Sequence, residues 1–328
     1  MAETALVCTS HSPLMGFSDP GPGIRERVDA AFASARAFIE DFAPDLVVLF
    51  GPDHYNGVFY DMMPPFCVGA AATSIGDYDT PAGDLLVDRD AAYAILRHVL
   101  ACDIDMTLSE RMYVDHGFAQ PLQLLLGGLD RVPVVPIFVN SVAEPLGPPR
   151  RARQLGRAVG DALQKLSGRV LLVGSGGLSH DPPAPRLADA DEATAARIIS
   201  EGRALTPAQR AEREMRTIRA GQDMAVGTST LQPLNSEWDR LVLDVLADGD
   251  LDRVDTWTTE WFIEQAGHSS HEVRTWIAAY AALAVNGRYC VTSRFYEAIP
   301  AWIAGFAVTQ AVSQRAATAH SVPKEVAR

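Results

Sequence analysis

Four of the eight histidines stand in short loops rich in Gly, Ser, Pro and Asp, directly after or between apolar segments. They are His11, His54, His116 and His180. Imidazole has an ordinary pKa close to neutrality, and it is also the commonest metal ligand among side chains. The four together predict a metal site with acid–base groups beside it. No cysteine shares these loops, so the ligands would be nitrogen and oxygen, which suits Fe(II), Mn or Zn.

Strands are expected to position three of these histidines. His11, His54 and His180 each follow a short apolar run typical of a buried strand, and the runs are 5–8, 46–50 and 170–173. Ligands of open α/β sheets bind outside the carboxyl ends of the strands. We therefore expect the three histidines to meet at one sheet edge, with His116 in a turn before the next apolar segment.

The elements between the strands indicate an α/β fold. Apolar residues recur at helical spacing over 24–42, and the strand, helix, strand order around them suggests a parallel pair with a right-handed crossover. The fold expected is a central mixed, largely parallel sheet flanked by helices, with a helical C-terminal addition. Further helices are predicted at 84–101 and 150–166, and a strand at 106–114. A strand at 132–140 contains prolines that favour a sheet edge.

The composition bounds the function. With 48% apolar residues and a net charge of −13, the chain is globular and acidic, which argues against nucleic acid or an anionic membrane as partner. The four cysteines show no CxxC spacing, and the N-terminus has no signal pattern, so a cytoplasmic protein is expected. We expect one catalytic domain over 1–312, a disordered tail over 313–328 and a homo-oligomer. The polar helical segment 189–225 is expected to be solvated or in a subunit interface, without catalytic residues.

Two tempting motifs are excluded. The glycine-rich run 174–177 lacks the lysine and the spacing of a phosphate-binding loop. Ser175 lacks the Gly-x-Ser-x-Gly context of a hydrolase nucleophile. The glycines are better explained as letting the backbone approach a ligand and turning His180 inward.

Four motifs taken together resemble one known family. They are Ser-His-Ser-Pro-Leu at 10–14, Pro-Asp-His-Tyr-Asn at 52–56, Val-Asp-His-Gly-Phe-Ala-Gln-Pro at 114–121 and Gly-Ser-Gly-Gly-Leu-Ser-His at 174–180. In this order they resemble the class III extradiol ring-cleavage dioxygenases. The similarity runs from the first strand to the aromatic tail at 299–306.

The resemblance implies a mononuclear non-haem Fe2+ held by two histidines and one carboxylate. His11 and His54 match the histidine ligands, and Glu272, in Ala-Gly-His-Ser-Ser-His-Glu at 266–272, matches the carboxylate. The competing interpretation is a capping box, in which Ser269 and Glu272 only cap their own helix. Glu237 or Asp53 would then be the fallback ligand.

The resemblance also assigns roles to the other two histidines. His116 matches the family's proton donor and His180 its proton acceptor. A catechol must lose protons to chelate a metal, and a later O–O cleavage is assisted by an acid. The implied substrates are 3-substituted catechols, such as 3-(2,3-dihydroxyphenyl)propionate and 2,3-dihydroxycinnamate, with O2. Two alternatives stay open, namely a zinc-dependent enzyme and a non-catalytic binding protein on the same scaffold.

Overall fold

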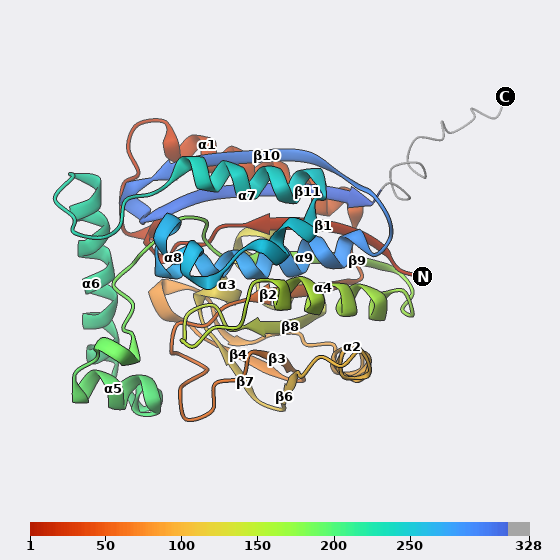
Figure 1. The fold of residues 1–328 in the computed structure, drawn as a ribbon, viewed down its shortest axis with the longest axis horizontal. Helices are drawn as coiled ribbons and strands as arrows, with labels where there is room; N and C mark the ends of the chain where they lie inside the picture. The colour runs from red at the N-terminus through yellow and green to blue at the C-terminus, as the bar shows by residue number, and fades with distance from the viewer. Residues whose placement is uncertain (314–328) are drawn as a thin grey trace.

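The computed structural model describes residues 1–313, and its centre is an eight-stranded sheet (Figure 1). In spatial order the strands are β10 (Tyr289–Ile299), β11 (Ala304–Ser313), β1 (Glu3–Thr9), β9 (Arg169–Ser175), β2 (Leu46–Gly51), β8 (Val134–Val139), β3 (Phe66–Gly69) and β6 (Thr107–Ser109). A second sheet has the order β5 (Ala82–Asp84), β4 (Ala72–Ile75) and β7 (Met112–Val114).

The middle of the main sheet is parallel. β1, β9, β2 and β8 all run in the same direction, whereas β11 and β3 pair antiparallel with the outer members of this group. Every residue of β2 and β8 is buried, as expected for strands covered on both faces. The predicted fold class, a mixed and largely parallel α/β sheet, is therefore confirmed.

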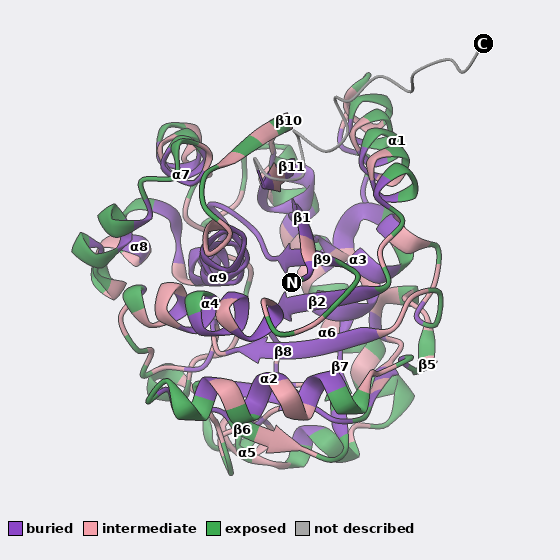
Figure 2. Ribbon diagram, turned by 90° about the vertical axis from the view of Figure 1, so that its right-hand side faces the viewer, coloured by how far each residue is buried: buried purple, intermediate pink, exposed green. Residues whose placement is uncertain are grey.

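Helices cover both faces of the sheet, and Figure 2 shows buried strands between helices whose outer faces are exposed. Alternate strand residues supply the two cores: Val48 packs with α2, α4 and α9, while Val47 packs with α1 and α3. The predicted helix over 24–42 is confirmed. The α-helices are α1 (Ile24–Phe42), α2 (Arg89–Ala101), α3 (His116–Leu126), α4 (Arg150–Leu163), α5 (Glu192–Ile199), α6 (Pro207–Ala225), α7 (Ser236–Asp248), α8 (Thr259–Ala266) and α9 (Val273–Ala284).

The strand positions differ from the sequence prediction in two respects. β1 and β2 are parallel, but β9 lies between them and hydrogen-bonds to both. The strand predicted at 132–140 lies inside the sheet, so its assignment to an edge was wrong. The physical reason is the register, because the ladder between β8 and β3 begins at Ile137 and does not require an N–H from Pro136.

Two further predictions need correction. The strand expected over 106–114 is divided into β6 and β7, which belong to different sheets. The helix expected from residue 84 begins at Arg89, because Asp88 caps it through a hydrogen bond from the Ala91 N–H and residues 82–84 form β5.

Helix-to-helix contact is closest between α4 and α9. A Cβ added to Gly156 would lie 2.0 Å from the carbonyl oxygen of Ala278, so only glycine permits this approach. None of the described helices is both long enough and apolar enough to cross a membrane. The tail predicted to be disordered falls, apart from Ser313 at the end of β11, outside the described residues.

Candidate active site

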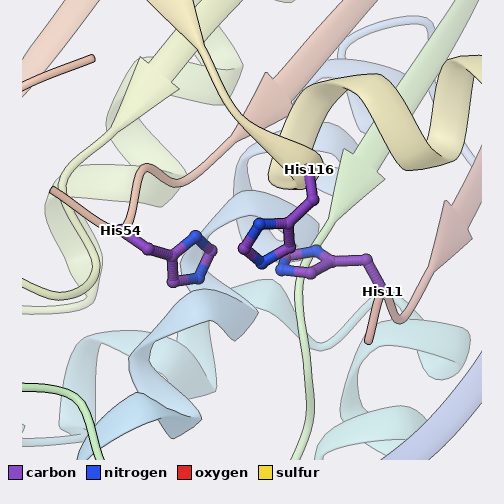
Figure 3. A group of neighbouring side chains, drawn as sticks. All are labelled: His11, His54 and His116. Carbon is purple, nitrogen blue, oxygen red and sulfur yellow. The ribbon is translucent and has the colours of Figure 1, made fainter. Parts of the chain in front are cut away.

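The structure brings the histidines of separate loops together at the carboxyl ends of the strands. His11 follows β1, His54 follows β2, and His116 is the first residue of α3. Their side chains point toward one another (Figure 3). The ring centroids of His54 and His116 are 4.5 Å apart in a stacked arrangement, and that of His11 lies 5.5 Å from His54 and 5.4 Å from His116. One nitrogen from each of the three rings lies within 4.8 Å of the others, close enough for a shared ion.

Glu272 is the carboxylate at the centre of this cluster. It ends the short 3-10 helix His268–Glu272, and only 1% of the residue is exposed. Its Oε1 lies 3.0 Å from Nε2 of His54 and 3.1 Å from Nε2 of His180, and its Oε2 lies 3.4 Å from Nε2 of His11. The Gly177 N–H donates to Oε2 at 2.9 Å. One carboxylate thus contacts three of the four histidines.

The competing roles for Glu272 do not match the geometry. No side chain caps either the 3-10 helix or α9 in the described part of the chain, so the structure does not contain the alternative capping box of Ser269 and Glu272. The carboxylate is turned toward the histidines instead. Of the fallback ligands, Glu237 is exposed on α7, and Asp53 accepts the N–H groups of its own loop at 2.8–3.1 Å.

The charge state of the cluster is set by burial and by these contacts. Burial lowers the pKa of His11 to about 3, although the negative charge of Glu272 acts to raise it. The His11 ring is therefore neutral at neutral pH and able to bind a metal. Burial alone would raise the pKa of Glu272, but His180, His11 and His54 hold it well below its ordinary value. No lysine or arginine among residues 1–313 forms an ion pair with Glu272. The three histidines are thus its charge partners among the described residues, and imidazole nitrogens with a carboxylate oxygen are a donor set that fits Fe(II).

Hydrogen bonds at Nδ1 fix the orientation of two rings. Nδ1 of His11 lies 3.0 Å from Oγ of Ser175, and this hydroxyl donates its own hydrogen to the Gly117 carbonyl at 2.7 Å. His11 must therefore be the donor at Nδ1, which leaves the lone pair of Nε2 free. His180 likewise donates from Nδ1 to the Leu178 carbonyl at 3.0 Å. The exclusion of Ser175 as a nucleophile agrees with its buried, hydrogen-bonded place.

Two aspartates that the sequence did not indicate form hydrogen bonds with the rings of His54 and His116. Oδ2 of Asp115 lies 3.0 Å from Nδ1 of His54, and Oδ2 of Asp77 lies 2.5 Å from Nδ1 of His116. Each aspartate also accepts the backbone N–H of the same histidine, at 2.9 and 2.8 Å. Carboxylate partners of this kind orient functional imidazoles. Asp115 precedes His116 in the sequence, but its partner is His54, a pairing that the spacing could not indicate.

A cavity of about 210 Å³ opens beside the four histidines and Glu272. Part of its wall is apolar or aromatic, from Leu14, Tyr78, Trp302 and Ile303. The segment 189–225, expected to be solvated or in a subunit interface and to hold no catalytic residues, also contributes to the cavity wall. A run of arginines on polar helices is typical of a solvated face, and only the tertiary placement of α5 and α6 turns some of them inward. These two helices contribute Thr194, Arg197, Arg213, Arg216 and Thr217.

Comparison with known proteins defines the class of protein. Residues 5–307 match the family described as the catalytic LigB subunit of aromatic ring-opening dioxygenase. The chain belongs to this family, which confirms both the resemblance drawn from the four motifs and the enzyme class, an extradiol ring-opening dioxygenase.

Relatives within the family carry more particular names. A protein of Rhodococcus sp is 64% identical over 94% of this chain and 98% of its own length. One of Rhodococcus jostii (strain RHA1) is 62% identical over the same shares, and one of Mycolicibacterium gilvum (strain PYR-GCK) is 52% identical over 95% and 99%. All three are named 2,3-dihydroxyphenylpropionate/2,3-dihydroxicinnamic acid 1,2-dioxygenase.

Proposed function

We propose that this enzyme uses Fe(II) and O2 to open the ring of 3-(2,3-dihydroxyphenyl)propionate and 2,3-dihydroxycinnamate. The bond cleaved joins a hydroxylated ring carbon to its neighbour outside the diol, and both atoms of O2 enter the product. The names of the relatives support the substrate. The observation that carries the proposal is the convergence of His11, His54 and His180 on the single buried carboxylate of Glu272.

His11, His54 and Glu272 would hold the iron. Two imidazoles and one carboxylate form the donor set of non-haem Fe(II) oxygenases, in which open positions remain for substrate. Bound Fe(II) supplies the activation of O2 and the polarisation of the catechol oxygens. The protein contributes the orientation of the ligands, through Ser175 behind His11 and Asp115 behind His54.

His180 and His116 are proposed as proton acceptor and proton donor. In neutral His180, Nδ1 donates its hydrogen bond to the Leu178 carbonyl, so Nε2 is the nitrogen that can accept a catechol proton. Burial disfavours its charged form, but Glu272 outweighs burial and raises the pKa of His180, which supports proton uptake. His116 directs Nδ1 to Asp77, so Nε2 is the nitrogen that can deliver a proton. Both rings line the cavity.

The test is anaerobic reconstitution with Fe(II), followed by the catechol and then air. We expect equal consumption of catechol and O2 and the appearance of a yellow ring-opened product. A parallel sample loaded with Zn2+ should be inactive, because zinc has no redox chemistry. Turnover with zinc and without O2 uptake would favour the zinc enzyme instead. Tight catechol binding without turnover in any metal form would favour the binding protein.

We also propose a single catalytic domain over 1–312 and a cytoplasmic homo-oligomer. The acidic composition and the absence of paired cysteine motifs support the compartment. Sedimentation of the purified full chain tests the assembly, and a monomeric mass would contradict it.

A further inference from the structure

Three arginines of α5 and α6 line the active-site cavity, and one of them hydrogen-bonds to the loop that follows β2. Arg213 donates to Oδ1 of Asn56 at 3.0 Å and also to the backbone carbonyls of His54 and Tyr55. It therefore ties α6 to the loop that carries His54. Figure 1 shows α5 and α6 standing at the end of the sheet toward which β1 and β8 point. This is the end at which the histidines gather.

The other two arginines make no comparable hydrogen bonds within the described residues. Neither Arg197 nor Arg216 makes a side-chain hydrogen bond or an ion pair within residues 1–313, although both line the cavity. Burial, together with the nearby cations of Arg213 and Arg216, lowers the pKa of Arg197, and the opposing effect of Asp191 does not cancel the decrease.

Carboxylates are plentiful elsewhere in this chain, whose net charge is −13. Several arginines distant from the cavity pair with them, as Arg89 does with Glu110 and Arg203 with Asp61. The unpaired charge of Arg197 and Arg216 is distinguished by its position, because both side chains line the cavity that holds the histidines. It matches a negatively charged group that is supplied from outside the chain.

The rest of the cavity limits what that group can be attached to. The wall formed by Leu14, Trp302 and Ile303 is suited to an aromatic ring, and the histidines with Glu272 are suited to the diol. A volume of about 210 Å³ matches one small ligand. The ligand therefore combines a diol, an aromatic ring and an acidic substituent within one small molecule.

We propose that Arg197 and Arg216 bind the carboxylate of the substrate's side chain and select catechols with an anionic 3-substituent over neutral ones. This inference rests on the proposed function and adds the residues that determine its specificity. A guanidinium can offer two parallel N–H donors to a carboxylate, and a charge-assisted pair of this kind is among the stronger hydrogen bonds in proteins. Both arginines act on substrate choice and leave proton transfer to the histidines.

The test compares 3-(2,3-dihydroxyphenyl)propionate with 3-propylcatechol, which keeps the diol and the chain but lacks the carboxylate. The Fe(II)-loaded full chain and its Arg197→Met, Arg216→Met and double variants are assayed with both. We expect kcat/KM for the acid to fall roughly 10- to 100-fold for each single variant, the usual worth of a hydrogen bond to a charged group. For 3-propylcatechol it should stay within about twofold. Arg219→Met is the matched control, since Arg219 is exposed on the same helix and does not line the cavity.

Anaerobic binding of both catechols, measured by calorimetry, separates this inference from the proposed function. If the wild type binds the acid more tightly than 3-propylcatechol, and the double variant loses this preference, the inference stands even when neither catechol is cleaved. Equal losses for both catechols would overturn it, as would a double variant that keeps the wild-type preference. Failure of the wild type to cleave either catechol, with the binding preference intact, would contradict the proposed function alone.

Discussion

Asp77 holds His116 through two hydrogen bonds, one to the ring and one to the backbone. Its Oδ2 lies 2.5 Å from Nδ1 of His116, and its Oδ1 accepts the His116 N–H at 2.8 Å. Asp77 is itself almost fully buried and belongs to the turn that also carries Tyr78, a residue of the cavity wall. The aspartate thus fixes both the ring orientation of His116 and the start of α3. It is a positioning residue, because its carboxylate acts through the imidazole.

Replacement of Asp77 should therefore impair turnover without loss of metal. Asp77→Asn keeps the size of the side chain but removes its charge, and we expect kcat to fall roughly 10- to 100-fold, as is usual for carboxylates that orient a functional imidazole. Iron content and the KM for catechol should stay near those of the wild type. Asp84→Asn, in an exposed residue paired with Thr73, is the control and should change nothing. Wild-type kcat in Asp77→Asn would show that His116 does not depend on this partner.

Loss of either proposed histidine ligand should remove the iron. In His11→Ala and His54→Ala, two remaining ligands cannot retain Fe(II) against a chelator, so both iron content and turnover should be lost. Elemental analysis after gel filtration checks this directly. His98→Ala, in a histidine on α2 that does not line the cavity, should keep its iron. Full iron content in both ligand variants would exclude these residues from the metal site.

Glu272→Gln distinguishes a charge at the metal from a mere structural contact. The amide oxygen of glutamine can still accept the Gly177 N–H, but the negative charge facing His11, His54 and His180 is gone. We expect the iron affinity to fall by at least about tenfold, with a near-normal melting temperature of the metal-free protein. Glu237→Gln, on the exposed face of α7, serves as the control. Normal iron binding and activity in Glu272→Gln would remove it from the ligand set.

The sequence allowed the strand ends and their histidines to be predicted, because both signals are local. Apolar runs mark buried strands, and the carboxyl ends of parallel strands share one edge, so His11, His54 and His180 could be expected to meet. The partners of these rings could not be predicted in the same way. Asp77 reaches His116 from a turn 39 residues earlier in the chain, and nothing in the intervening sequence indicates that contact.

The same limit explains the errors in the fold and the cavity-wall residues that the sequence did not indicate. Proline at 136 predicts a sheet edge only if a neighbouring strand needs the N–H that proline lacks, and the observed register removes that need. Arg197 and Arg216 lie on helices whose composition is that of a solvated surface. Their function depends on where α5 and α6 pack, which is decided by residues far away in the sequence.

Close packing of α4 on α9 gives a prediction about stability. In Gly156→Ala the new methyl group would meet the Ala278 carbonyl at 2.0 Å, and neither backbone can move away without disturbing the core. We expect the free energy of unfolding to fall by about 3 kcal/mol, at the upper end of the cost of overpacking. Gly128→Ala, where no atom lies closer than 3.4 Å, should be near neutral. Denaturant unfolding of both variants measures the difference, and equal midpoints would contradict the contact.

The acid–base pair is tested by substitutions that separate His116 and His180 from the ligands. His116→Gln and His180→Gln should each retain iron and bind catechol, yet lose turnover by roughly 10²- to 10⁴-fold, the usual worth of a positioned acid or base. The two variants should fail at different stages. Without His180 as acceptor, the anaerobic spectral change that reports loss of the catechol protons should be weaker. Without His116 as donor, that change should persist and the reaction should stall only after O2 is admitted.

The stage of failure is what assigns the roles. His180 contacts Glu272 directly at 3.1 Å, so its variant also needs the iron analysis used for the ligands. His116 is held by Asp77, and His116→Gln combined with Asp77→Asn should be no slower than His116→Gln alone, because both changes remove the same function. If the losses multiply, Asp77 acts in a way that does not pass through His116. If iron leaves with either histidine, that residue belongs to the ligand set and its role in proton transfer is wrong.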